Sequence, residues 1–171
     1  MHHVRYSYLC NMAKYNITEH KDRIVDYQST INPTVLDELH VKILDKLLVQ
    51  KKYKDKDYSA KHLAEDLGTN CRYISAAICL KCHTNYASLV NKYRVEEAMT
   101  LLVDRRYTDL SMEDVGGMVG FANRQSFYSA FFKVVGCAPR AYKMEYLKAH
   151  GMLPAKRRRK SPKEGDAQNK E

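Results

Sequence analysis

The chain of 171 residues contains 29 Lys and Arg against 20 Asp and Glu, which gives a formal net charge of +9. This length is enough for one ordinary domain or two small ones, and the positive charge favours a polyanionic partner. No apolar run is long enough for a membrane span or a signal peptide, so the composition argues against membrane association.

Residues 1–34 form a leader in which Tyr6, Tyr8, Tyr15 and Tyr27 stand among polar residues without a sustained period. A segment this short cannot bury enough apolar surface to fold alone, and we expect it to be poorly ordered or dependent on a partner. Pro33 marks its end, because the residue before a proline avoids the helical region.

A first helical unit is predicted over about residues 35–84. It begins with a helix over Val35–Gln50, in which apolar residues recur at spacings of three and four: Leu36, Leu39, Ile43 and Leu47. The charged run Lys51–Asp57 is expected to be a solvated loop. Two shorter helices follow, joined by a turn at Gly68.

The second of these short helices is predicted from Asn70, its N-cap, to about Cys82. Arg72 and Ser75 are predicted on its outer face. Ala76 is assigned to the same face, where its short side chain could contribute little to base recognition. We therefore expect this helix to contribute little to sequence specificity.

A longer helix is predicted from Tyr86 to about Val103, within a connecting segment of residues 85–104. Its apolar residues lie near one side: Leu89, Val90, Tyr93, Ala98, Leu101 and Leu102. Because neither flanking unit could bury much apolar surface alone, we expect this linker helix to belong to both cores.

A second unit is predicted over about residues 111–147. Its first helix begins at a capping box of Ser111 and Asp114 and ends at Gly120, which supplies the turn, and Phe121 closes over the angle between the helices. The next helix starts near Asn123, an expected N-cap. It buries Phe127, Phe131 and Val134 and exposes Arg124, Gln125, Tyr128 and Ser129.

The two units repeat one another. Ser59, Leu63 and Gly68 match Ser111, Val115 and Gly120 at an offset of 52 residues, and Ile74 and Ile78 match Phe127 and Phe131 at an offset of 53. A pair of short helices with a glycine turn, occurring twice, is typical of repeated helix-turn-helix units. Arginine and glutamine on the outer face of the second helix suit guanine and adenine edges in the major groove.

These features resemble the DNA-binding domain of AraC/XylS-type bacterial transcription regulators, over about residues 35–147. The resemblance includes the string Tyr93-Arg94-Val95-Glu96-Glu97-Ala98-Met99, the Val119-Gly120-Phe121 turn, and later Gly136, Pro139 and Tyr142. It implies an all-α fold of two homeodomain-like helix-turn-helix units, joined by a long linker helix and entering successive major grooves. The sequence departs from the family at Val115-Gly116-Gly117, where glycines in place of an Ile-Ala start predict a looser second unit.

The resemblance predicts a sequence-specific, DNA-binding transcription regulator, with double-stranded DNA as its partner and RNA polymerase or a sensor protein as further candidate partners. Because the leader is too short for the ligand-binding domain of the family's full-length members, we expect no effector pocket. Either the polypeptide responds to its own abundance or to a partner, or it is the output end of a longer regulator. Residues expected to contact DNA are Asn70, Arg72, Ser75, Ala76, Asn123, Arg124, Gln125, Tyr128 and Ser129. Arg124, Gln125 and Arg72 are the candidates for direct base readout. Capping is the simpler role for Asn70 and Asn123.

Cys79-Leu80-Lys81-Cys82-His83 satisfies the C-x-x-C-H string of covalent haem attachment. Attachment takes place in an exported compartment, and the string falls at the end of a predicted helix, so we expect no haem. Zinc is disfavoured because adjacent residues 82 and 83 cannot readily both reach one tetrahedral ion. We predict no cofactor and no metal, and five cysteines without a secretory signal indicate a reducing cytoplasm.

No phosphate-binding glycine loop, nucleophile elbow or paired carboxylates suggest an enzyme. Residues 148–171 are predicted to be a disordered tail whose Lys156–Lys160 run adds sequence-independent attraction to phosphates. Two alternatives stay open: a non-specific architectural DNA-binding protein, and an interaction protein whose leader recruits a partner. The sequence leaves the oligomeric state undetermined.

Overall fold

The structure is a computed structural model that describes residues 32–107 and 109–152. These residues form helices joined by short turns, with no strand among them, so the all-α prediction is confirmed. The predicted leader and the predicted basic tail lie mostly outside the described residues, and the calls made on them stay predictions.

The first unit consists of α3 (Pro33–Leu44), α4 (Ala60–Asp66) and α5 (Cys71–Cys82). The side chain of Asn32 caps α3 by accepting a hydrogen bond from the backbone N–H of Thr34 (3.0 Å). A π-helical turn, η2 (Asp45–Val49), then extends the helical segment over most of the predicted range. The four apolar residues named from their spacing, Leu36, Leu39, Ile43 and Leu47, are all buried.

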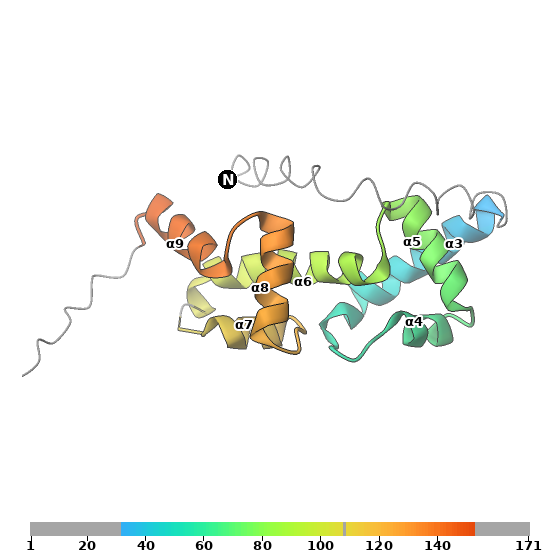
Figure 1. The fold of residues 1–171 in the computed structure, drawn as a ribbon, viewed down its shortest axis with the longest axis horizontal. Coiled ribbons are helices and arrows are strands. Elements are labelled where there is room, and N and C mark those ends of the chain that lie inside the picture. Colours follow the sequence, from blue (N-terminus) through green and yellow to red (C-terminus); the bar gives the residue numbers. More distant parts are fainter. Residues whose placement is uncertain (1–31, 108, 153–171) are drawn as a thin grey trace, which may run out of the picture.

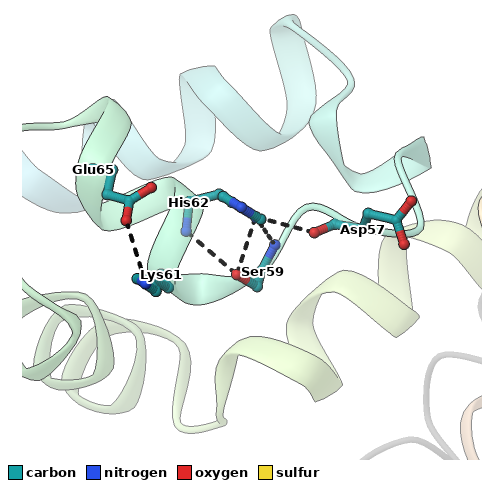
Figure 2. A network of polar contacts seen from close by, with 5 residues as sticks. All are labelled: Asp57, Ser59, Lys61, His62 and Glu65. Carbon is teal, nitrogen blue, oxygen red and sulfur yellow. Dashed lines mark hydrogen bonds and ion pairs between the residues drawn. The ribbon is translucent and has the colours of Figure 1, made fainter.

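The short helix α4 is held at its start by a reciprocal cap (Figure 2). The Ser59 hydroxyl accepts a hydrogen bond from the backbone N–H of His62, and Nδ1 of His62 accepts one from the backbone N–H of Ser59, both at 3.3 Å. One turn on, Lys61 and Glu65 pair at 3.9 Å. A helix this short is unstable in isolation, so this cap and the burial of Leu63 hold it in place.

The second unit consists of α7 (Met112–Met118), α8 (Arg124–Val135) and α9 (Pro139–Ala149). The capping box predicted for α7 is confirmed: the Asp114 N–H donates to the Ser111 hydroxyl (3.1 Å), and the Ser111 N–H donates to the Asp114 carboxylate (3.0 Å). Both α4 and α7 therefore begin with the same arrangement. The repeat seen in the sequence is a structural repeat.

Aromatic rings fill the core of the second unit. Phe127 and Phe131 are fully buried, with ring centroids 5.7 Å apart, and Phe121 lies 5.4 Å from Phe127. Phe121 is buried against Phe127 in the turn between α7 and α8, as predicted. Gly120, just before it, has a φ of +97°, which a turn of this kind requires and which glycine adopts without steric cost.

The linker helix α6 (Tyr86–Val103) lies along the long axis of the molecule, with the first unit at one end and the second at the other (Figure 1). Leu89 and Val90 belong to the buried cluster of the first unit, whereas Val95, Ala98 and Leu102 belong to that of the second. The linker thus belongs to both cores, as predicted. A single turn, η4 (Arg105–Tyr107), follows it.

The prediction of a solvated loop over Lys51–Asp57 is wrong in its centre. The 3-10 turn η3 (Lys52–Lys54) packs against α6. Tyr53 is buried and its hydroxyl donates to the Glu97 carboxylate, which also pairs with the Lys54 ammonium at 2.6 Å. The prediction failed because the charged residues on both sides of Tyr53 made the run look fully exposed, although the Tyr53 ring is buried.

Candidate nucleic-acid interface

The exposed surface of α8 begins directly at its cap. Asn123 accepts a hydrogen bond from the backbone N–H of Ser126 (2.8 Å), so its expected capping role is confirmed. Arg124, Gln125 and Ser129 are exposed, while the opposite side of the helix packs into the core. The N-terminal half of α8 therefore presents side chains with both donors and acceptors on its outer surface.

Arg124 is held by its neighbour one turn on. Its guanidinium carbon lies 5.0 Å from the centroid of the Tyr128 ring, and Nη2 lies 3.4 Å from the Tyr128 hydroxyl. The Tyr128 ring is half-buried and meets Phe127 edge-on at 5.9 Å. Since the ring is anchored in the core, it restricts the positions that the arginine can take before a ligand binds.

The corresponding surface of α5 is narrower. Asn70 accepts hydrogen bonds from the backbone N–H groups of Arg72 (3.0 Å) and Tyr73 (3.1 Å), which confirms its expected role as a cap. Arg72 and Ser75 are exposed, as predicted.

Ala76 does not lie on the outer face and cannot contact a ligand, because its exposed fraction is 0%. The assignment of Ala76 to the recognition surface is therefore wrong. The physical reason is that α5 packs against α3 as well as against α4 and α6, so that two sides of the helix are covered. This leaves Arg72 and Ser75 to carry the polar surface at the start of α5.

Both candidate recognition helices lie in stretches of chain without a carboxylate. No Asp or Glu occurs between Asp66 and Glu96, or between Asp114 and Glu145. The first stretch contains Arg72, Lys81, Lys92 and Arg94, and the second contains Arg124, Lys133, Arg140 and Lys143. The charged residues of both helices are consequently all cationic, which favours a polyanionic partner.

Two of the cations in the first stretch interact with other groups of the protein. Lys81 pairs with the Asp37 carboxylate of α3, and Arg94 donates to the backbone carbonyls of Tyr53 in η3 and Asp55 just after it. The positive charge of the first carboxylate-free stretch therefore comes chiefly from Arg72 of α5 and Lys92 of α6.

A groove lies on each side of α8. The inner groove, between α8 and the first unit, has a volume of about 400 Å³, and its cationic side chains are Lys92 and Lys133, next to His83. The outer groove, of about 390 Å³, lies between α7, α8 and α9 and is lined by Arg124, Arg140 and Lys143, with Glu113 as its one acidic residue. Together the grooves flank the recognition helix with basic side chains.

Sequence reasoning missed Lys92, Lys133, Arg140 and Lys143 as candidate contacts. Their position beside α8 depends on how α6 and α9 pack, which helical periodicity does not reveal. A usable signal was present nonetheless, since all four fall within the two stretches that lack carboxylates.

The Cys79–His83 string belongs to the end of α5. Cys79 is buried, and His83 ends the helix in the left-handed region. Cys82 Sγ lies 3.3 Å from Nε2 of His40; burial raises the pKa of the Cys82 thiol and, with the charge of Lys81, lowers the pKa of His40. Both groups therefore meet in their neutral forms. Among residues 32–107 and 109–152, no three His, Cys, Asp or Glu side chains gather in a way that could hold a metal ion.

Within the same described part of the chain, the helices are too short or too polar to cross a membrane.

Comparison with known proteins relates this arrangement to helix-turn-helix regulators. Residues 63–145 match the family model of a helix-turn-helix domain. No curated protein matches the chain.

Several solved structures have the same fold. One is the C-terminal domain of AraT, a response regulator from Geobacillus stearothermophilus, with 25% identity and a TM-score of 0.54 over 68% of this chain and 88% of that one. Another is the C-terminal domain of the two-component response regulator yesN from Fusobacterium nucleatum, with 23% identity and a TM-score of 0.53 over 60% and 97% of the two chains. A transcriptional regulator with an AraC-type DNA-binding domain, from Chromobacterium violaceum, shares 18% identity, with a TM-score of 0.52 over 61% and 91%.

Proposed function

We propose that the chain is a transcription regulator of the AraC helix-turn-helix type that binds specific sequences of double-stranded DNA. The observation that carries this proposal is the pairing of two structurally repeated units, each with an exposed, carboxylate-free recognition helix. Such a role is carried out in the cytoplasm, where the DNA of a bacterial cell lies.

In this proposal α5 and α8 enter two successive major grooves on one face of the duplex. The major groove admits an α-helix and presents a different pattern of donors and acceptors for each base pair. Arg124 would donate to a guanine edge and Gln125 would pair with adenine. In the first unit Arg72 is the base-reading candidate, with Ser75 beside it.

The remaining candidate residues act around these contacts. Asn70 and Asn123 cap the helices through their side-chain oxygens, which leaves their amide NH₂ groups to donate to the backbone or to a base. Tyr128 holds Arg124 and Ser129 lies one turn along α8. Lys92 and Lys133 of the inner groove, with Arg140 and Lys143 of the outer groove, would hold phosphates and set the register of α8.

RNA polymerase or a sensor protein would complete the regulatory output, and the leader is the segment we assign to such a partner. No cofactor and no catalytic step enter this function.

A second function, non-specific architectural DNA binding, is favoured by one observation. The burial of Ala76 leaves α5 with few polar groups at its exposed start. A first unit of this kind could bind the phosphate backbone of the duplex while contributing little to sequence specificity.

Selection of bound duplexes from a random pool separates these possibilities. A motif of two elements whose centres lie about one helical turn apart, roughly 10 base pairs, supports the regulator. A motif with a single element means that α8 contacts bases while the first unit binds only the DNA backbone. Strong, salt-sensitive binding without any motif identifies the architectural protein, and absence of binding contradicts both functions.

A further inference from the structure

The two units touch each other directly, away from the axis of the linker helix. Arg94 of α6 donates from Nε to the Tyr53 carbonyl oxygen (2.5 Å) and from Nη2 to that of Asp55 (2.9 Å). Its guanidinium carbon also lies 5.5 Å from the ring centroid of Phe121, in the turn of the second unit. One side chain thus joins a loop of the first unit to the turn before α8.

Glu97 holds the same loop one turn further along α6. Its carboxylate accepts hydrogen bonds from the Tyr53 hydroxyl and from the Lys54 ammonium, the latter at 2.6 Å. Charge-assisted bonds of this kind are stronger and more directional than neutral ones. Arg94 and Glu97 therefore fix η3 against the half of α6 that carries the second unit.

The loop then meets the second unit at backbone level. A Cβ atom placed on Gly120 would lie 2.3 Å from the Lys54 carbonyl oxygen, so the two backbones are in contact there. The buried Phe121 follows directly. We call this set the inter-unit contact; it consists of Tyr53, Lys54, Arg94, Glu97, Gly120 and Phe121.

We propose that the inter-unit contact sets the spacing and the rotation between α5 and α8, so that the protein accepts one separation between its two DNA elements. The units pack on different stretches of α6, and a single helix connecting them would leave them free to bend and twist about it. A second connection, off the helix axis, removes that freedom. Arg94 and Glu97 act here as positioning residues that do not touch DNA.

This inference rests on the proposed function, and its consequence for DNA is geometric. Each base pair added between two elements moves the second one by about 3.4 Å and rotates it by about 35°. Two rigidly connected recognition helices cannot follow such a change without losing contacts in one groove. Two loosely connected helices can follow it at a smaller loss of affinity.

The experiment compares Glu97→Gln with Glu96→Gln in the full chain. Both variants remove one negative charge from neighbouring positions of α6, but Glu96 is exposed whereas Glu97 lies in the inter-unit contact. Arg94→Lys is a second test that keeps the charge and loses the two-pronged donation. Affinity is measured for the selected duplex, for duplexes with two base pairs inserted or deleted between its elements, and for a single element.

We expect the wild type and Glu96→Gln to share the same strong preference for one spacing. In Glu97→Gln and Arg94→Lys the preference should fall by about tenfold, which corresponds to about 1.4 kcal/mol of coupling, while affinity for a single element stays unchanged. Unchanged spacing preference in both variants overturns the inference and leaves the proposed function standing. A wild-type protein without any preferred sequence or spacing overturns both.

Discussion

Gly120 of the second unit lies against the carbonyl group of Lys54 in the first unit, with room for a hydrogen atom but none for a methyl group. The contact joins a turn and a loop that are far apart in sequence. The two helix-turn-helix units are therefore in direct backbone contact at this point.

Replacing Gly120 with alanine should destabilise the protein more than the same change at Gly136. Both glycines have positive φ, +97° and +86°, so alanine at either site meets backbone strain of about 1 to 2 kcal/mol. Only at Gly120 does the new Cβ also meet a backbone atom; nothing lies within 4 Å at Gly136. Urea unfolding of the two variants measures the difference, and equal losses would show that the units do not touch there.

The glycine pair in α7 allows the opposite comparison. A Cβ on Gly116 would lie 3.2 Å from Phe127, so glycine at this position permits close packing, whereas nothing lies within 4 Å of Gly117. We predict that Gly117→Ala stabilises the protein by about 0.5 to 1 kcal/mol, because it removes the entropic cost of glycine in a helix. Gly116→Ala should give no such gain. Thermal melting tests both, and a gain at Gly116 as large as that at Gly117 would contradict the packing.

Arg124→Ala should weaken binding to the selected duplex by about 1 to 3 kcal/mol and binding to a scrambled duplex much less, because the lost contact is with a base. Arg106→Ala, in η4, removes the same charge and serves as the control. Titrations of both duplexes give the comparison. Equal losses on the two duplexes would make Arg124 a phosphate contact.

Lys133→Ala, in the inner groove, should weaken binding to both duplexes alike. Loss of one phosphate contact lowers the slope of log affinity against log salt concentration by about 0.9. The control is Lys42→Ala, which removes an exposed lysine of α3 outside both grooves. If the two variants have the same slope, Lys133 does not meet the backbone.

The inter-unit contact should weaken in acid. Burial alone would raise the pKa of Glu97, but the hydrogen bonds from Lys54 and Tyr53 outweigh it and hold the pKa below its ordinary value of 4.5. A carboxylate with a lowered pKa stabilises the fold fully above the pKa of the unfolded chain, and this stabilisation is lost as pH falls through the folded value. The difference in unfolding free energy between wild type and Glu97→Gln should therefore shrink below about pH 4.5. A difference that stays constant from neutral pH to pH 3 would contradict this role for Glu97.

Much of this fold could be predicted because local rules determine it. Helical spacing identified Leu36, Leu39 and Ile43 of α3 and Phe127 and Phe131 of α8 as buried, although Val134 is only half-buried and Ala130 and Val135 are buried as well. Cap chemistry identified the starts of α5, α7 and α8. These signals lie within a few residues of the structure they specify.

The failures all concern contacts between distant parts of the chain. Ala76 is small enough for a surface or a core, and only the packing of α3 against α5 decides between them. Tyr53 and Glu97 are 44 residues apart, so the charged run around Tyr53 looked like an ordinary loop. The basic grooves beside α8 were missed for the same reason, because α6 and α9 bring their lysines and arginines there.

Methylation protection of guanine N7 tests the central claim most directly, since this atom lies in the major groove. On the selected duplex, entry of α5 and α8 into successive major grooves predicts two clusters of protected guanines whose centres lie about 10 base pairs apart on one face. Bound duplex with no protected guanine, or with a single cluster, would contradict a protein that reads two grooves.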